Sequence, residues 1–330
     1  MQEKLVFMGT PSFAVPSLRA LTTRTERDRL LVVTQPDRAA GRGRRLQPPP
    51  VKVAAEEAGV EVMQVSTLRD AAARARLEEF APDLIVVAAF GLILPRWVLR
   101  LPAKGCVNLH ASLLPRFRGA SPVAAAIACG DERTGVALMQ MEAGLDTGAV
   151  YAVEVQVIAS NDTTASLTER LSQVAAKLLD ANLDALLKGD LQATPQQGKV
   201  IETRKIVKDH GAIDWNRRAA EIERHVRAMW AWPRAWTVGA GGVRVQVHEA
   251  EVEDESGAGE PGVVVGHDVN GVLVGTGGGM LRLCTVQLPG KAAQPASQLG
   301  QHPIFAPGAR LTNGEGFVPP DPWIVEAGEV

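Results

Sequence analysis

The segment Leu84–Ala88 most constrains the fold of this chain, because every one of its residues is apolar. A half-exposed strand alternates polar and apolar residues, whereas a strand buried on both faces of a parallel sheet does not. Three more short aliphatic runs end in glycine or polar residues, at 5–8, 30–34 and 107–110. Stretches with the length and polarity of covering helices lie at 13–24, 51–58 and 68–80. The alternation predicts a doubly wound, Rossmann-like α/β domain.

The predicted α/β domain extends to residue 188. Residues 135–141 and 149–158 predict two further strands around a glycine-rich turn, and residues 167–187 predict a long helix with Gly189 as its stop. We therefore expect residues 1–188 to fold as one unit.

A change in composition separates this unit from a second one, as a length of 330 residues favours. Residues 189–208 are rich in Gly, Pro and Gln and have a basic end, which is typical of a linker. Residues 209–312 contain one predicted helix and then short runs with glycine turns, which predicts a small OB-like β-barrel. Residues 313–330 contain several prolines and predict an irregular tail.

Charge and cysteine content exclude several classes of protein. Lys and Arg total 35 against 37 Asp and Glu, a formal charge of −2, which argues against binding of nucleic acid by bulk charge but leaves room for a local basic strip. The three cysteines and six histidines are dispersed, so we expect neither a disulfide scaffold nor a metal site. Without a signal peptide or an apolar run of membrane-spanning length, the sequence predicts a cytoplasmic protein.

The turn after the first predicted strand, residues 8–14, bears on nucleotide binding. Its only glycine is Gly9, so it lacks both the Gly-x-Gly-x-x-Gly spacing of dinucleotide sites and a Gly-Lys-Ser/Thr phosphate loop. Ser112 and Ser121 lack Gly-x-Ser-x-Gly surroundings. These observations disfavour a nicotinamide enzyme, a nucleoside triphosphatase and a serine hydrolase.

Two polar residues interrupt the apolar run that ends at His110. If residues 106–110 form a strand, its period of two places Asn108 and His110 on one face. Ligands of open α/β sheets bind outside the carboxyl ends of the strands, where this pair would lie. A carboxamide donates fixed hydrogen bonds and an imidazole moves protons near neutral pH, so the pair predicts a site that stabilises an oxyanion. The alternative is a pair of polar groups satisfied by neighbouring backbone.

Asp146 lies in a glycine-flanked turn between two predicted strands. Its carboxylate could orient His110 or relay protons through water. The alternative is an Asx turn, in which the carboxylate bonds its own backbone. Only a partnership with His110 favours a catalytic role for Asp146.

Residues 34–50 form an arginine-rich segment with Gly41 and Gly43 as flexible points. Such a loop suits an induced fit onto phosphate groups, because each guanidinium presents a planar fork of donors. The alternative is an ordinary solvated loop. The arginines concerned are Arg38, Arg42, Arg44 and Arg45.

Together these segments resemble the methionyl-tRNA formyltransferase family. In the N-terminal half the similar blocks are FMGTPSFA (7–14), QPDR (35–38) with GRG (41–43), AFGLILP (89–95), NLHASLLP (108–115) and GLDTG (144–148). In the C-terminal half they are IDW (213–215), residues 222–227 and WPRAWT (232–237), so the resemblance covers about residues 4–311. The NLH and LDTG blocks are shared by folate-dependent formyltransferases in general, whereas the QPDR loop and the C-terminal blocks are more specific to the tRNA enzyme.

The resemblance implies an enzyme that transfers a formyl group from 10-formyltetrahydrofolate to the α-amine of initiator methionyl-tRNA, in support of translation initiation. It makes Asn108, His110 and Asp146 the catalytic residues and the β-barrel a tRNA-binding domain. The residues implied to border the folate are Phe90, Gly91, Leu92, Ser112, Leu113, Leu114 and Pro115, with a cis bond before Pro115. The residues implied to contact tRNA are Arg38, Arg42, Arg44, Arg45, Lys205 and Lys208, with Arg42 nearest the acceptor end.

This chain departs from the family pattern at two places. Phe117 stands where the family often has Trp, and the tail after Leu311 is longer than usual.

Three alternative functions stay open at this point. A formyltransferase for a sugar-nucleotide amine would leave the arginine loop without a role, a folate hydrolase or formyl-folate dehydrogenase would use water as acceptor, and a nucleic-acid-binding module would have a decayed site. We expect a monomer.

Overall fold

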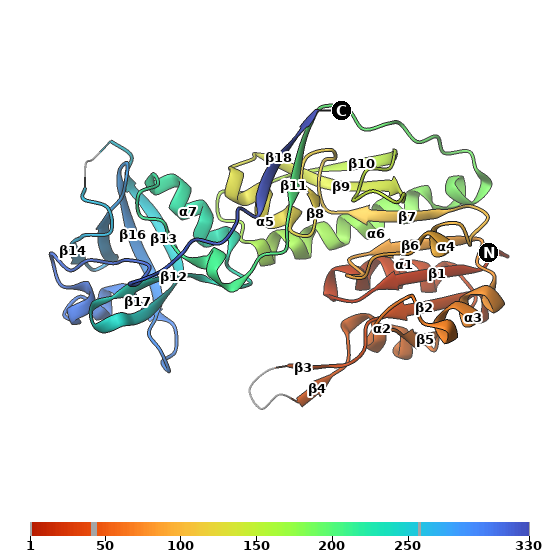
Figure 1. Cartoon of the computed structure of the whole chain (residues 1–330), viewed down its shortest axis with the longest axis horizontal. Helices are drawn as coiled ribbons and strands as arrows, with labels where there is room; N and C mark the ends of the chain where they lie inside the picture. The colour runs from red at the N-terminus through yellow and green to blue at the C-terminus, as the bar shows by residue number, and fades with distance from the viewer. Residues whose placement is uncertain (1, 41–44, 257–258, 330) are drawn as a thin grey trace.

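The computed structural model describes residues 2–40, 45–256 and 259–329 (Figure 1). Its N-terminal domain is built on a seven-stranded sheet in the order β10–β9–β7–β6–β1–β2–β5. The strands are β1 (Leu5–Gly9), β2 (Leu30–Thr34), β5 (Glu61–Gln64), β6 (Leu84–Ala88), β7 (Cys106–His110), β9 (Arg133–Gln140) and β10 (Val150–Val157). All neighbours from β7 to β5 pair in parallel, while β9 pairs antiparallel with β7 and β10 antiparallel with β9. The predicted α/β fold is confirmed.

Helices cover both faces of this sheet. Leu5 and Phe7 of β1 lie in the core that includes residues of α1, α2 and α6, whereas Val6 and Met8 lie in the core that includes residues of α3 and α4. β6 is buried at every position because helices cover both faces of the sheet there as well. The helices are α1 (Val15–Arg24), α2 (Pro50–Ala58), α3 (Ala71–Phe80), α4 (Arg96–Leu99), α5 (Pro122–Cys129) and α6 (Thr164–Lys188).

The C-terminal domain combines helix α7 (Ala219–Ala228) with an antiparallel sheet in the order β12–β13–β16–β15–β14, and β17 pairs with β16. Isolated bridges join Val238 to Thr312 and Val263 to Arg310, so one segment contacts both edges of this sheet. α7 packs against α5 of the first domain. The strands are β12 (Ala235–Gly239), β13 (Val243–Asp254), β14 (Val264–Asp268), β15 (Gly271–Gly275), β16 (Met280–Gln287) and β17 (Gln294–Pro295). Short 3-10 helices are η1 (Ser12–Ala14), η2 (Arg27–Arg29), η3 (Lys208–Gly211), η4 (Ala240–Gly242), η5 (Ala296–Leu299) and η6 (Pro303–Phe305).

A third, three-stranded sheet joins segments that are far apart in the sequence. Its order is β18 (Ile324–Glu329), β11 (Lys199–Thr203) and β8 (Arg118–Gly119), and Figure 1 shows β18 beside β11 over the N-terminal domain. The expected linker therefore contains a strand, and the expectation of an irregular tail over 313–330 is wrong for residues 324–329. β18 is an edge strand that buries little surface, so its sequence lacks the usual apolar pattern.

The arginine-rich segment contains two short strands, β3 (Arg38–Ala40) and β4 (Arg45–Gln47), which pair with each other. The sequence predicted a loop there. Arg42 and Arg44 lie outside the described residues. Across the described ranges, every helix is too short or too polar to cross a bilayer.

Candidate active site

β7 carries its two polar residues at the carboxyl end of the parallel strands. Val107 and Leu109 belong to the core beneath α6, whereas Cys106 belongs to the core beneath α3 and α4. Asn108 and His110 therefore share the face of Cys106, as a strand period of two requires. His110 is 6% exposed and Asn108 is half-buried. Among the hydrogen bonds of the described residues none involves the Asn108 side chain, so its carboxamide is available to a ligand.

Both ring nitrogens of His110 face oxygen atoms. Nε2 donates a hydrogen bond to the carbonyl of Phe117 at 2.9 Å, and Nδ1 lies 3.5 Å from Oδ2 of Asp146. Phe117 and Asp146 have φ values of 61° and 51°, a left-handed conformation that is uncommon outside glycine. Because a carbonyl and a carboxylate only accept hydrogen bonds, the arrangement suits a ring that carries two N–H donors.

The Asp146 carboxylate is fixed from a second direction. The backbone N–H of Gly119 donates to Oδ2 at 2.8 Å, and the Gln196 amide donates to the carbonyls of Asp146 and Gly148 at 2.7 and 2.8 Å. The buried Arg118 in turn donates twice to Oε1 of Gln196, at 3.0 and 2.7 Å. No contact from a described residue engages Oδ1 of Asp146, so this oxygen can receive a proton.

Arg118 and Gln196 were missed by the sequence analysis. Gln196 lies in the segment interpreted as a linker, and its neighbour Gln197 has the same side chain, so nothing local marks it. Arg118 is 7% exposed, which is unusual for arginine, but burial of a charged side chain is not visible in a sequence. Their role in holding Asp146 becomes apparent only from the fold.

Cys106 shares a face of β7 with the two polar residues and must be considered as a nucleophile. Burial raises the pKa of its thiol to about 12, and Sγ donates to the Val98 carbonyl at 3.6 Å. The thiol is therefore protonated at neutral pH, and covalent catalysis by Cys106 is not supported.

The segments implied to border the folate follow β6 and β7. Phe90 is buried, and its carbonyl accepts hydrogen bonds from Thr10 Oγ1 at 2.9 Å and Gln35 Nε2 at 2.7 Å. Ser112 is also buried and donates to the Arg116 carbonyl at 2.7 Å. The structure has the cis bond before Pro115. Gly91 is exposed, Pro115 is buried, and the others are half-buried: Leu92, Leu113 and Leu114.

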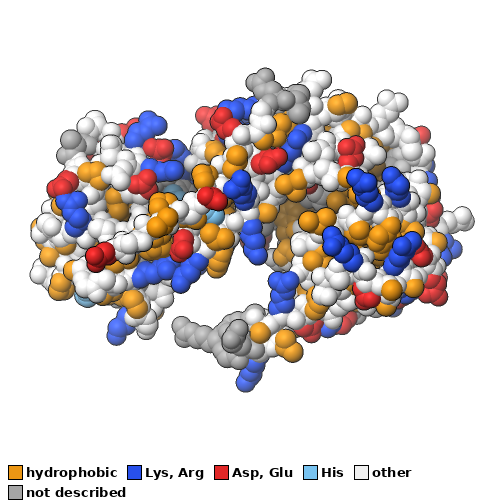
Figure 2. All heavy atoms as spheres, viewed as in Figure 1, with side chains coloured by type: hydrophobic (Ala, Val, Ile, Leu, Met, Phe, Trp, Pro, Cys, Tyr) orange, Lys and Arg blue, Asp and Glu red, His pale blue; other side chains and the backbone are white. Residues whose placement is uncertain are grey.

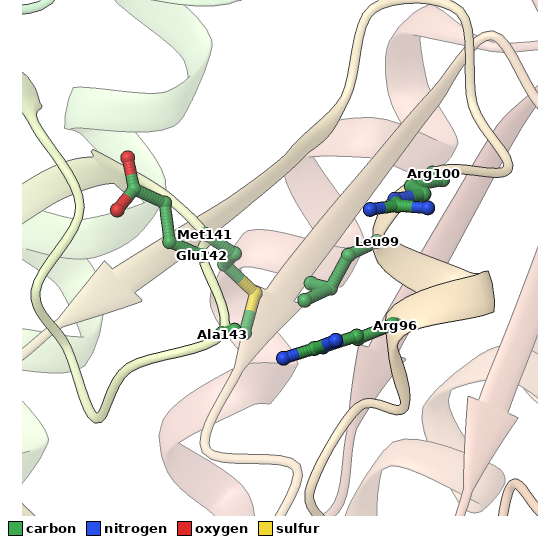
Figure 3. Close-up of a pocket in the computed structure, with 6 residues that line it drawn as sticks. All are labelled: Arg96, Leu99, Arg100, Met141, Glu142 and Ala143. Carbon is green, nitrogen blue, oxygen red and sulfur yellow. The ribbon is translucent and has the colours of Figure 1, made fainter.

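A cavity of about 430 Å³ lies beside these segments, between α4 and the loop that carries Asp146 (Figure 3). Arg96 and Leu99 extend towards Met141 and Ala143, while the Glu142 carboxylate points away from both arginines. Met141 and Leu92 pack against the same apolar core. Residues implied to bind folate do not line this cavity, so the sequence analysis missed its lining: Arg96, Leu99, Arg100, Met141, Glu142 and Ala143. A second cavity, of about 350 Å³, is lined in part by Leu114, Tyr151 and Gln196.

The basic residues implied to contact tRNA are exposed wherever the structure describes them. Arg38 donates to Oε1 of Gln35, whereas no salt bridge in the described part of the chain involves Arg45, Lys205 or Lys208. Figure 2 shows Lys and Arg side chains on both sides of the hollow between the two domains. The described residues contain no group of His, Cys, Asp and Glu side chains that could hold a metal ion.

Comparison with known families covers both domains. Residues 3–183 match the family described as Formyl transferase, and residues 205–302 match the Formyl transferase C-terminal domain. Among solved structures, the N-formyltransferase of Helicobacter canadensis, in complex with folinic acid and dTDP-3-aminofucose, is similar with a TM-score of 0.66 at 17% identity. The match covers 86% of this chain and 99% of that chain. That likeness concerns the fold alone.

Curated relatives are much closer in sequence. The methionyl-tRNA formyltransferase of Marinobacter nauticus is 42% identical over 311 residues, which is 93% of this chain and 99% of the relative. That of Myxococcus xanthus is 44% identical over 308 residues, which is 93% of this chain and 97% of the relative. That of Coxiella burnetii is 44% identical over 316 residues, 96% of this chain and 99% of the relative. With both domains matched and such identity over nearly its whole length, the chain belongs to the methionyl-tRNA formyltransferase family.

Proposed function

We propose that Asn108, His110 and Asp146 catalyse transfer of a formyl group from 10-formyltetrahydrofolate to the α-amine of initiator methionyl-tRNA. The observation that carries this proposal is the arrangement of His110 between the Phe117 carbonyl and Asp146, beside an unpaired Asn108 carboxamide. The donor supplies a formyl carbon bonded to a folate nitrogen. A bond forms between the amine nitrogen and that carbon, the bond from the carbon to the folate nitrogen breaks, and a proton moves from the amine to the folate nitrogen.

Asn108 and His110 stabilise the negative charge that develops on the formyl oxygen. The Asn108 amide donates directly. The Nδ1–Asp146 separation of 3.5 Å exceeds an ordinary N–H···O hydrogen bond, so the Nδ1–H can be shared with a substrate oxygen. Such donors act strongly because they are fixed before the reaction begins.

Asp146 moves the proton. Its Oδ2 is engaged by Gly119 and faces His110, which leaves Oδ1 to accept a proton from the attacking amine, directly or through water. Free α-amines titrate near about 7.7–8.0, so much of the amine is already neutral at cellular pH. The amine nitrogen becomes positively charged when it bonds to the formyl carbon, and the carboxylate then removes one of its N–H protons and delivers it to the leaving folate nitrogen.

The cavity between α4 and the Asp146 loop is the proposed site for the ring system of the donor. Its apolar Leu99 and Met141 suit a flat heterocycle, and its position next to the Asp146 loop supports the proposal. Phe90, Gly91 and Leu92, with Ser112 to Pro115, form the neighbouring walls of the donor site in this proposal.

The basic residues and the C-terminal domain are proposed to hold the tRNA. The exposed Arg45, Lys205 and Lys208 can meet phosphates without breaking a salt bridge described in the structure, and Arg38, Arg42 and Arg44 belong to the same arginine-rich segment. The proposed units are residues 1–188 for catalysis, 189–208 as linker and 209–312 as an OB-like barrel. The bridges at Val238 and Val263 support closure of that barrel. We propose a monomer.

One assay tests the proposal against its alternatives. Purified protein is incubated with 10-formyltetrahydrofolate and methionyl-tRNA, an amino-sugar nucleotide, or no acceptor, and formylated product and free tetrahydrofolate are measured. We expect rapid formylation of methionyl-tRNA only. Faster formylation of the sugar nucleotide, or equal release of tetrahydrofolate without acceptor, would overturn it.

A further inference from the structure

The C-terminal strap, residues 317–329, connects the C-terminal domain to the catalytic end of the N-terminal domain. The Phe317 ring meets Trp236 of β12 edge-on, with centroids 5.6 Å apart. Further along, the Asp321 carbonyl accepts a hydrogen bond from His210 Nε2 at 2.9 Å, and the Trp323 carbonyl accepts one from the Arg204 backbone N–H at 2.7 Å. The strap then continues as β18, which pairs with β11.

β11 is held on its other side by β8. Thr203 of β11 lies opposite Gly119, and its Oγ1 donates to the Arg118 carbonyl at 2.9 Å. Oγ1 of Thr203 also accepts the Ser121 N–H at 3.0 Å. A Cβ at Gly119, where φ is 103°, would lie 2.1 Å from the Thr203 carbonyl oxygen, so the two strands could not approach in this way with any other residue.

β8 and the residue before it supply two of the groups that orient the catalytic pair. The Phe117 carbonyl accepts the His110 hydrogen bond, and the Gly119 N–H donates to Asp146. Phe117 is 2% exposed and lies in an apolar cluster with Ala125, Ala126 and Ile201 of β11. Trp323 and Ile324 of the strap pack against this cluster. The strap therefore reaches the groups that hold His110 in two ways: β18 pairs with β11, and Trp323 and Ile324 pack against the cluster that contains Phe117.

We propose that the strap is a positioning element of the formyl transfer: by holding β11 against β8, it fixes the Phe117 carbonyl and the Gly119 N–H that set the geometry of His110 and Asp146. This inference rests on the proposed catalytic role of that pair. Trp323 and Ile324 touch no reacting group, so they act through Phe117 and β11. Their effect belongs to turnover and not to donor binding, because the cavity beside α4 is lined by other residues.

The test compares three single variants of the full chain. Ile324→Ala removes packing against the Phe117 cluster and Ile324→Val retains most of it. Glu326→Ala, on the exposed side of β18, removes an ion pair with Lys199 and a weak charge interaction with Arg116 but no apolar packing on Phe117. For each variant, kcat and KM for both substrates are measured well below its own melting temperature. We expect Ile324→Ala to lower kcat by about tenfold or more, since misplacement by about 1 Å can cost about 100-fold, with the donor KM unchanged. Ile324→Val and Glu326→Ala should stay close to the unaltered protein.

Three results would overturn the strap proposal. A lower melting temperature with unchanged kcat in Ile324→Ala would show that the strap only stabilises the fold, and a loss of kcat in Glu326→Ala equal to that of Ile324→Ala would show that packing on Phe117 is not the cause. A raised KM for methionyl-tRNA with unchanged kcat would show that the strap acts on the placement of the domains. Retained turnover in Asp146→Asn, by contrast, would refute the proposed catalytic site itself.

Discussion

The proposed catalytic pair, His110 and Asp146, and the basic surface of this enzyme are built in opposite ways. His110 is buried and Asp146 is half-buried, and both are held by backbone and side chains from the segment at β8, the linker and, indirectly, the strap. Arg45, Lys205 and Lys208 are exposed, and the described part of the chain offers them no salt bridge. The difference matches two physical tasks. Charge developing on a small group must meet donors at fixed positions, whereas a polyanion is attracted over a distance and can be met by mobile side chains.

The largest effect is expected from Asp146→Asn, which removes the negative charge of the side chain and keeps its shape. This variant tests whether turnover requires a carboxylate held at a fixed position. We expect kcat to fall by about 100- to 10,000-fold, because proton transfer by a positioned side chain contributes that much, with little change in donor affinity. Single-turnover formylation and donor binding by fluorescence measure the two quantities. Asp184→Asn is a matched control, since that carboxylate is exposed and pairs with Arg24. Near-normal turnover of Asp146→Asn would mean that a fixed carboxylate is not required.

Asn108→Ala should give the next largest effect. Loss of one oxyanion donor costs about 100- to 1,000-fold in kcat, which is about 2.7–4 kcal/mol in the barrier. The fold should be unaffected, because the Asn108 side chain has no hydrogen bond to a described residue that the change would break. Thermal unfolding and kcat together check this expectation, and a large drop in melting temperature with modest loss of kcat would point to a structural role.

The desolvated ring of His225, in α7, should make the free energy of unfolding depend on pH. Desolvation lowers the pKa of this ring to about 4 from its ordinary value near 6.5. The unfolded chain therefore takes up a proton first as pH falls, and stability that is complete above pH 6.5 is lost towards pH 4. By pH 5 the loss should be about 2 kcal/mol, or about 30-fold in the folding equilibrium. Urea unfolding at pH 7.5 and 5 should show this loss in the unaltered protein and a smaller one in His225→Gln. Equal losses in the two proteins would contradict it.

Arg45→Ala should give the smallest effect, and it tests the exposed basic surface in place of the proposed catalytic pair. We expect a few-fold rise in KM for methionyl-tRNA, no change in donor KM, and a salt dependence of tRNA binding whose slope is reduced by about 1. Arg19→Ala, on the exposed side of α1, serves as the control. Parallel salt dependences for Arg45→Ala and the unaltered protein would show that Arg45 meets no phosphate.

Local periodicity was enough to predict six of the seven strands of the N-terminal sheet and the shared face of Asn108 and His110. β6 is buried at every position and α6 has a repeated apolar stripe, so each leaves a clear pattern in the sequence. β5 and β18 are edge strands with partial burial, and neither was predicted, because an edge strand needs few apolar residues. Whether a strand is at an edge depends on its neighbours in space, which the sequence of the strand does not contain.

Asn108 and His110 were predictable from the pattern of one strand, and Asp146 from its glycine-flanked turn together with the family resemblance. By contrast, the carbonyl of Phe117, the N–H of Gly119 and the Gln196 amide reach the proposed catalytic pair by way of backbone conformation and long-range pairing. Main-chain groups have no residue identity, so no residue type marks them in the sequence. The cavity lining was missed for a related reason, since α4 and residues 141–143 meet only after folding.

The sheet β18–β11–β8 has a consequence for the order of folding. Thr203 and Arg118 are 85 positions apart, and the whole C-terminal domain separates β11 from β18, so this sheet closes two of the longest loops in the chain. Contacts of such high sequence separation form slowly. During refolding, helical signal should therefore return before the Phe117 and Gly119 groups reach His110 and Asp146, and enzymatic competence should be among the last properties that the chain acquires.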